Sequence, residues 1–480
     1  MVHYASALMP HAAGAHSSGV TQPGGWININ RGQWYFVQVY YLVGSGTSGN
    51  IQWWLDDTLE GSRLAYNNSA KVPRYFRLAD IQGVDAGTSG KVYYDDAKVD
   101  TATIQQSGPY LYTSIAALPS GVWKGGVRLT NVATKTALDS QSKWWYDTTN
   151  QRVYISQASA PSDAEIQTRN YGIDTTSVTP SHIAIDGLDF QKQKQNIRLY
   201  SWSTAASDWT IQNSSFQTEP NTGDISTAIY GTGNTGTFDG ITVTNNTITP
   251  WPNSPLTYVN NSYGIYFTGV TGKTPVSNFL IDDNVIGPAG KHAICVWHAS
   301  TGTISNNTTG GNAESSIDVK DTPYVKITRN VADNDGEYSI IYDAVDVAGS
   351  THDGEVSYNH VTRGGQNHGV DHGHGPNLYG DIALHATQNT VVKYNVVETS
   401  WGSGIYLDDY ASIGGGHDNS VIYNVVNGNG TGVLLGGIDL GDVVNGVVYG
   451  NTVYTAAQNG LYFSGGAHST GNVIKNNIVT

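Results

Sequence analysis

The chain has very little of the residues that build helices, disulfides or charged interfaces. Of its 480 residues, 13% are charged, two are methionine and one is cysteine, whereas 57 are glycine. A single cysteine excludes a disulfide framework, and the scarcity of Leu, Glu, Lys and Met argues against a helical protein. Because Asn, Thr, Ser, Val, Ile and Tyr are plentiful, the composition predicts a β-rich, turn-rich chain in which Cys295 is a packed thiol.

Long apolar runs and an excess of basic charge are also absent. No segment reaches the roughly 20 apolar residues of a membrane-spanning helix, and segment 1–25 has no apolar core of a signal peptide. With 24 basic and 39 acidic side chains the formal net charge is −15. This charge disfavours nucleic acid as a partner and favours a neutral glycan or a bound metal. We expect no membrane insertion, and the oligomeric state stays open.

An asparagine recurs at the end of a short strand pattern. The positions are Asn246, Asn284, Asn307, Asn330, Asn359, Asn395, Asn424, Asn451 and Asn477. A second, apolar series runs in parallel through Ile265, Ile294, Ile317, Ile340, Ile382, Ile405, Val433 and Leu461. Intervals of 23 to 38 residues are typical of a solenoid. Since the units hold short strands and no helical period, we predict a right-handed parallel β-helix, with the asparagines in the left-handed conformation and stacked as a ladder.

The first hundred residues follow a different pattern. Strand-like segments at 34–41, 51–56, 75–78 and 91–96 are separated by turns, as in antiparallel hairpins. The motifs WLD at 54–56 and GKVYYDD at 90–96 resemble the closing half of a laminin-G or concanavalin-like domain. We therefore predict an all-β protein with a partial β-sandwich at 1–104 and the β-helix at 105–480, truncated at both ends.

One five-residue pattern recurs in the middle of the solenoid. The copies are SIDVK at 316–320, SIIYD at 339–343, DIALH at 381–385 and GIYLD at 404–408. Alternation of period two points the second and fourth residues into the core and the fifth outward. We thus predict an exposed column of Lys320, Asp343, His385 and Asp408, whose strands rise in steps of ~4.8 Å. Asp343 and Asp408 would lie roughly 10 Å apart, near the upper limit for carboxyl pairs that invert a glycosidic bond.

These positions lead to a set of candidate site residues. The catalytic candidates are Asp343, Asp408, Asp409, His385 and Lys320, and the substrate-binding candidates are Trp297, Tyr406, Asp318 and Arg363. Two insertions supply residue types that bind metals, calcium in the first case: Asp333, Asp335 and Glu337 in one, and His368, Asp371, His372 and His374 in the other. We expect both insertions to form one wall of a groove beside the column.

Several motifs resemble those of a known enzyme family. SKWWYD at 142–147, RVYI at 152–155, HIAIDGLDF at 182–190 and GIYLDD at 404–409 are similar to segments of the β-helix of bacterial glycoside hydrolases of family 141. The resemblance implies hydrolysis of plant or algal glycans by paired carboxylates, here Asp408 and Asp343, without a required cofactor, in a secreted or cell-surface bacterial protein whose leader is absent here. The usual DGGAIY segment is missing, and YSIIYD at 338–343 stands nearest.

Two other functions stay open. Segment 314–330 is similar to the lysine-bearing coil of alginate and dermatan lyases, which implies a polysaccharide lyase or epimerase with Lys320 as base and calcium as a partner. Their Arg-His-Gly motif is absent, and Asp343 stands in its place. A noncatalytic adhesin or fibre that only binds glycans is the third possibility. A polysaccharide is the expected partner in all three cases.

Overall fold

The computed structural model divides the chain into two compact units, 1–168 and 169–480. It describes residues 37–42, 49–55, 58–66, 110–114, 118–119, 121–138, 140, 142–156, 164–167, 170–176, 180–201, 205–219, 225–233, 236–252, 254–269, 276–347, 349–366, 380–408, 416–429, 436–463 and 469–480. For the first four of these ranges only the backbone is described. No α-helix occurs in these ranges, and they therefore contain no helix that is long and apolar enough to cross a membrane.

Unit 1 consists of short, mainly antiparallel strands. They are β1 (Val37–Leu42), β2 (Gly49–Leu55), β3 (Thr58–Tyr66), β4 (Tyr110–Ser114), β5 (Gly121–Lys124), β6 (Val127–Arg128), β7 (Thr130–Asn131), β8 (Lys143–Asp147), β9 (Arg152–Ser156) and β10 (Ala164–Gln167), with a 3-10 turn at Lys135–Ala137. Strands β1 and β2 match two of the predicted hairpin segments. Segments 75–78 and 91–96 lie outside the described residues, so the laminin-G-like sandwich stays a prediction. The predicted boundary at 104/105 falls inside unit 1.

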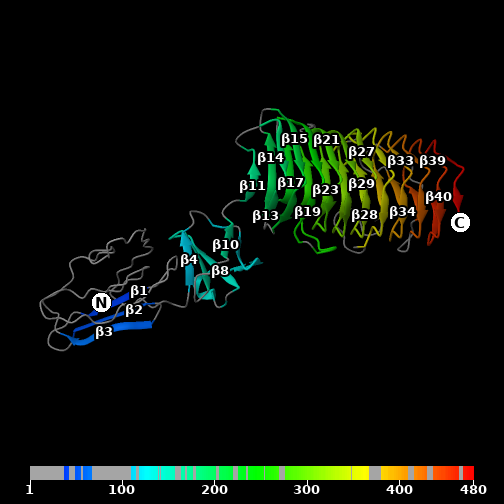
Figure 1. Ribbon diagram of the computed structural model, residues 1–480. Helices are drawn as coiled ribbons and strands as arrows, with labels where there is room; N and C mark the ends of the chain where they lie inside the picture. Colours follow the sequence, from blue (N-terminus) through cyan, green and yellow to red (C-terminus); the bar gives the residue numbers. More distant parts are fainter. Residues whose placement is uncertain are drawn as a thin grey trace. The chain divides into compact units, whose positions relative to one another are not determined.

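Unit 2 is a solenoid of three parallel sheets, each with eleven strands in sequence order (Figure 1). Sheet 1 contains β11 (Tyr171–Asp174), β14 (Gln195–Ser201), β17 (Ser226–Gly233), β20 (Ser262–Thr268), β23 (His292–Trp297), β26 (Ser315–Lys320), β29 (Ile340–Asp343), β32 (Ile382–His385), β35 (Ile405–Asp408), β38 (Gly436–Leu440) and β41 (Asn459–Phe463). Sheet 2 contains β12 (Ile183–Asp186), β15 (Ala206–Gln212), β18 (Phe238–Thr244), β21 (Val276–Asp282), β24 (Ser300–Ser305), β27 (Val325–Thr328), β30 (Glu355–Ser357), β33 (Val391–Lys393), β36 (Ser420–Ile422), β39 (Val447–Tyr449) and β42 (Val473–Lys475). Sheet 3 contains β13 (Asp189–Gln193), β16 (Ser215–Thr218), β19 (Thr247–Thr249), β22 (Val285–Ile286), β25 (Thr308–Gly310), β28 (Val331–Asp333), β31 (His360–Thr362), β34 (Val396–Glu398), β37 (Val425–Asn427), β40 (Thr452–Tyr454) and β43 (Ile478–Val479). Each coil contributes one strand to each sheet, which confirms the predicted parallel β-helix.

The core of unit 2 is a set of apolar stacks along the solenoid. In sheet 1, Ile317, Ile340, Ile382 and Ile405 pair in register and are fully buried. Burial of each such side chain stabilises the fold by about 1.5–3 kcal/mol. The sequence assignment of Val433 to this stack was wrong, because Ile438 pairs with Ile405. A longer insertion precedes this strand and shifts the position by five residues.

The asparagine ladder occupies the turn between sheets 2 and 3. From Asn246 to Asn477, each side-chain amide donates to the Oδ1 of the next ladder asparagine at 2.9–3.0 Å. Each also donates to a main-chain carbonyl, as Asn359 does to Ile327 at 2.9 Å. The predicted ladder is confirmed, but its conformation is corrected. The residue before each asparagine has positive φ, for example Tyr358 at 57°.

Candidate active site on the outer face of sheet 1

The predicted column exists and is continuous. Trp297, Lys320, Asp343, His385 and Asp408 pair in register on five successive strands of sheet 1, from β23 to β35. The prediction that this column is exposed was wrong, because Asp343 is 4% and His385 is 2% exposed. A rule of alternation distinguishes the inner from the outer face, but it does not show what covers the outer one.

Two aromatic side chains enclose the histidine of the column. The rings of Tyr338 and Tyr406 both meet the His385 ring edge-to-face, with centroids 5.4 and 5.6 Å away. Tyr406 was predicted to present an aromatic surface to sugar, but it is only 5% exposed. Its hydroxyl instead donates a hydrogen bond of 2.8 Å to Asp408. Tyr406 therefore packs against the histidine and fixes a carboxylate.

The two aspartates of the column lie in different surroundings. Burial raises the pKa of Asp343 to about 8, and the charges of Asp318, Asp321 and Asp346 act in the same direction against the lowering effect of Lys320. Asp408 is only half-buried. A carboxyl group that stays protonated at neutral pH can donate a proton, whereas a partly hydrated carboxylate with a phenol donor can accept one or attack.

Lys320 is held by a carboxylate on its own strand. Its ammonium lies 2.9 Å from Asp318 Oδ2. Burial alone would lower the pKa of Lys320, but the charge of Asp318, supported by Cys295 and Asp343, outweighs that effect and raises the pKa. Asp318 was predicted to bind substrate, and the structure places it in this ion pair at 1% exposure. In this arrangement the lysine is a cation rather than a free base.

A second outward column contributes an aspartate that the sequence reasoning missed. Asp439 on β38 pairs in register with Tyr406 and is fully buried. Burial raises its pKa to about 7, and the charge of Asp408 adds to the effect. The signal was present in GGIDL at 436–440, which repeats the pattern of SIDVK. It was overlooked because the apolar stack had been assigned to Val433.

Three further ionisable side chains lie near the start of the strands and close to the column, namely His292, Glu314 and Glu337. His292 Nε2 lies 3.1 Å from Glu314 Oε2 and 3.0 Å from Asp318 Oδ2. Burial raises the pKa of Glu314 to about 7 and that of Glu337 to about 9, each with help from neighbouring acidic groups. His292 and Glu314 had not been singled out, because they precede the five-residue pattern.

The three residues of the predicted calcium site have separate partners in the structure. Asp333 is ion-paired at the end of sheet 3 with Arg363, the predicted substrate-binding arginine. Asp335 is fully buried in the turn before sheet 1, where it accepts hydrogen bonds from Asn312 and Ser316. Glu337 lies beside Glu314 instead. Calcium binding at this insertion stays a prediction.

The other predicted residues divide into two groups. Asp409, His368, Asp371, His372 and His374 lie outside the described residues. Trp297 lies in the column and its indole N–H donates to Asp321 Oδ2 at 3.0 Å. Asp321 also accepts from the backbone N–H groups of Val345 and Asp346. This aspartate therefore organises the turn after β29.

Comparisons with known proteins agree with the fold. The family model described as a right handed beta helix region matches residues 197–375, in agreement with the predicted hand of the solenoid. One similar solved structure is the A-module of a mannuronan C-5 epimerase from Azotobacter vinelandii, with 12% identity, a TM-score of 0.39 and coverage of 62% of this chain and 80% of that chain. Another is the enzymatically active domain of tailspike protein 2 of bacteriophage CBA120, with 13% identity, a TM-score of 0.40 and coverage of 64% and 44%.

A third similar structure is the GH136 lacto-N-biosidase of Eubacterium ramulus, with 15% identity, a TM-score of 0.41 and coverage of 60% of this chain and 51% of that chain. At these identities and TM-scores the likenesses carry no argument about the function of this chain. No curated protein matches the chain. The chemistry of this protein therefore has to be argued from its own side chains.

Proposed function

We propose that the protein is a carbohydrate-active enzyme, and specifically a glycoside hydrolase in which Asp343 is the general acid and Asp408 the base or nucleophile. The observation that supports this most is the pairing of a buried carboxyl group, whose pKa is about 8, with a half-buried carboxylate two strands away in the same column. Two strand steps amount to about 10 Å between Cα atoms, so side-chain lean sets the carboxyl separation. A spacing of roughly 6.5–9.5 Å suits an inverting enzyme.

The charge of the outer face favours a neutral glycan. Within the described part of the chain, six acidic side chains gather there, namely Glu314, Asp318, Glu337, Asp343, Asp408 and Asp439, against the basic Lys291 and Lys320. Although burial keeps Asp343 and Glu337 protonated at neutral pH, a polyuronate would set its own carboxylates against the remaining acidic side chains. A neutral polysaccharide avoids that cost, and action on such a polymer suits a secreted protein.

A lyase or epimerase is the second candidate, because Lys320 stands in the column next to Asp343. As a base it would have to leave the ion pair with Asp318 and lose its proton in an acidic surrounding. The substrate carboxylate would also need a calcium ion. Both requirements make this function less favourable than hydrolysis.

A panel of neutral and acidic polysaccharides separates these functions. Each polymer is incubated with the protein, with and without a chelator, and both reducing ends and the ultraviolet absorbance of unsaturated uronates are recorded. We expect reducing ends without unsaturated product on a neutral glycan. Unsaturated product that Lys320→Ala abolishes would replace the hydrolase by the lyase, a changed uronate composition without cleavage would indicate the epimerase, and binding without any product would indicate an adhesin.

A further inference from the structure

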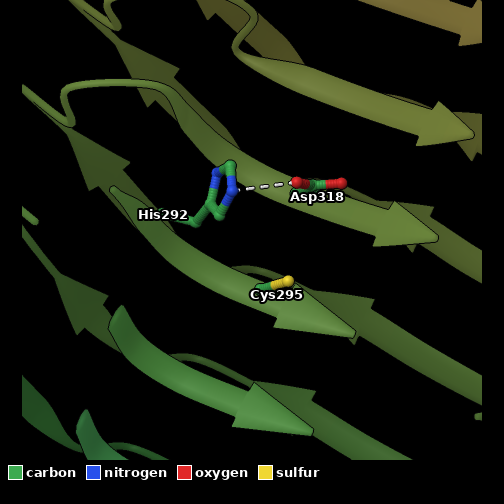
Figure 2. Close-up of side chains that lie close together, drawn as sticks. All are labelled: His292, Cys295 and Asp318. Atoms are coloured by element: carbon green, nitrogen blue, oxygen red, sulfur yellow. Dashed lines mark ion pairs between the residues drawn. The ribbon is translucent and has the colours of Figure 1, made fainter. Parts of the chain in front are cut away.

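A compact group of metal-ligand side chains lies beside the column on the outer face of sheet 1. His292 and Cys295 belong to β23, and Asp318 belongs to the adjacent β26, where it pairs in register with Cys295. One ligand atom from each residue lies within 4.8 Å of the others, and all three side chains are buried. Figure 2 shows His292 and Asp318 facing each other across the two strands, with Cys295 beside them.

Asp318 is the member of this group that hydrogen bonding leaves incompletely satisfied. Nε2 of His292 lies within 3.1 Å of two carboxylate oxygens, one from Glu314 and one from Asp318. A ring nitrogen carries at most one proton, so it can donate to only one of them at a time. Moreover, Asp318 is 1% exposed, and its Oδ1 has no hydrogen-bond partner in the described part of the chain. A buried carboxylate oxygen in that state is costly unless a cation binds it.

We propose that His292, Cys295 and Asp318 form a binding site for a zinc ion, with Glu314 as the candidate for the fourth ligand. A combination of imidazole, thiolate and carboxylate suits zinc better than calcium or magnesium, which take oxygen ligands. Bonds of about 2.0–2.3 Å place tetrahedral ligand atoms roughly 3.3–3.8 Å apart. Modest changes of side-chain rotamer therefore suffice to close the group around an ion.

The charge balance also favours a cation at this position. Glu314, Asp318 and Glu337 lie close together, so acidic side chains surround the three proposed ligands. Binding of zinc would release the thiol proton to solvent and would place two positive charges among these carboxylates. Oδ2 of Asp318 faces Nε2 of His292 at 3.0 Å, so an ion bound between these two atoms would replace the proton that they share.

A second group, formed by His298, Asp321 and Asp346, serves as an internal contrast. Its ligand atoms also lie within 4.8 Å of one another. Asp321, however, already accepts backbone N–H bonds from Val345 and Asp346 and the hydroxyl of Ser350. Because its oxygens are satisfied by the turn, and because the group has no sulfur, we expect no zinc there.

Metal titration of the untagged full-length protein tests the proposal. The protein is first treated with a chelator, and zinc or cobalt(II) is then added while bound metal is counted per chain. Since Cys295 is the sole cysteine of the chain, any thiolate-to-cobalt absorption band reports on this one residue. We expect one metal per chain and this band. The absence of stoichiometric binding, or binding without the band, would overturn the proposal.

Matched variants separate ligation from a folding defect. Cys295→Ser should abolish the cobalt band, and His292→Ala and Asp318→Asn should each weaken zinc binding at least tenfold. His298→Ala in the contrasting group and His360→Ala on β31 should bind zinc as the wild type does. Zinc X-ray absorption of the wild-type protein should show one sulfur at about 2.3 Å. Unchanged zinc binding in folded Cys295→Ser would refute the site, and this test does not depend on glycan hydrolysis.

Discussion

The asparagine ladder and the outer face of sheet 1 both stack buried polar side chains along the solenoid, yet they differ in one respect. In the ladder every coil repeats the same residue, and each amide is satisfied by its neighbour and a carbonyl, as Asn330 is. On the outer face the residue changes from one coil to the next, and Asp318 Oδ1 is left without a hydrogen bond. Repetition with full hydrogen bonding indicates a structural role. Side chains that vary between coils and whose pKa values are shifted by burial indicate a functional role.

The largest expected effect is on catalysis. Asp343→Asn and Asp408→Asn should each reduce the rate of glycan hydrolysis by about 10²- to 10⁴-fold, because proton transfer or nucleophilic attack would be lost. Thermal stability should change little, and Asp343→Asn should slightly increase it at high pH. Hydrolysis assays and thermal unfolding of the same samples measure both properties. Asp353→Asn, at an exposed position, is the matched control. Full activity in the two column variants would contradict the functional role of the outer face of sheet 1.

The ladder should show the opposite behaviour. Asn359→Ala deletes bonds to Asn330, Ile327 and Asn395 and leaves several buried groups unsatisfied, at about 1–3 kcal/mol each. We expect a loss of at least ~3 kcal/mol in the free energy of unfolding, measured by denaturant titration. The folded fraction should retain the activity of the wild type. A stable Asn359→Ala protein with reduced activity would contradict the structural role of the ladder.

The pH dependence of the hydrolysis rate should be a smaller effect than the loss of activity in the column variants. With a pKa of about 8, Asp343 keeps its proton at neutral pH, so the rate should fall about tenfold per unit above that value. This decrease at alkaline pH should be absent in Asp343→Asn, because its residual rate no longer depends on the proton of Asp343. A profile of kcat/KM against pH checks the expectation. A rate that rises between pH 7 and pH 9 would exclude Asp343 as the acid.

A further effect on stability, confined to a range of pH, concerns the buried carboxyl group of Asp335. Asp335 accepts a hydrogen bond from the amide of Asn312, one coil earlier in the turn before sheet 1, and is fully buried, and burial raises its pKa to about 7 from 3.8. The folded state therefore binds the proton more tightly, so this group's contribution is fully present below about pH 4 and is lost as pH rises to about 7. Asp335→Asn should remove that loss.

Thermal unfolding across pH measures this contribution. The stability gained by Asp335→Asn should grow between pH 4 and pH 7, with a slope on the order of 1 kcal/mol per unit, and stay constant above that range. Thr308→Ala, at an exposed position of β25, is a control that leaves the carboxyl group and its partners in place. A gain that is equal at pH 4 and pH 8 would show that the carboxyl group titrates normally.

The sequence alone was sufficient for the solenoid, the ladder and the order of the column. Strand alternation and the recurrent asparagine are local patterns, and a stacked fold turns them directly into register, as with Asp343 between Lys320 and His385. The prediction was wrong where the length of a loop varied. Val433 was therefore assigned to the position in the apolar stack that Ile438 occupies.

Only the tertiary structure decided how the outer face is covered and which of its side chains meet. The burial of Asp343, the enclosure of His385 by two tyrosines and the approach of His292 to Asp318 depend on residues from different coils. Periodicity states which way a side chain points, and it carries no information on what lies over that side chain. Burial and proximity between coils set the ionisation of these groups, so the chemistry of the site became visible only in three dimensions.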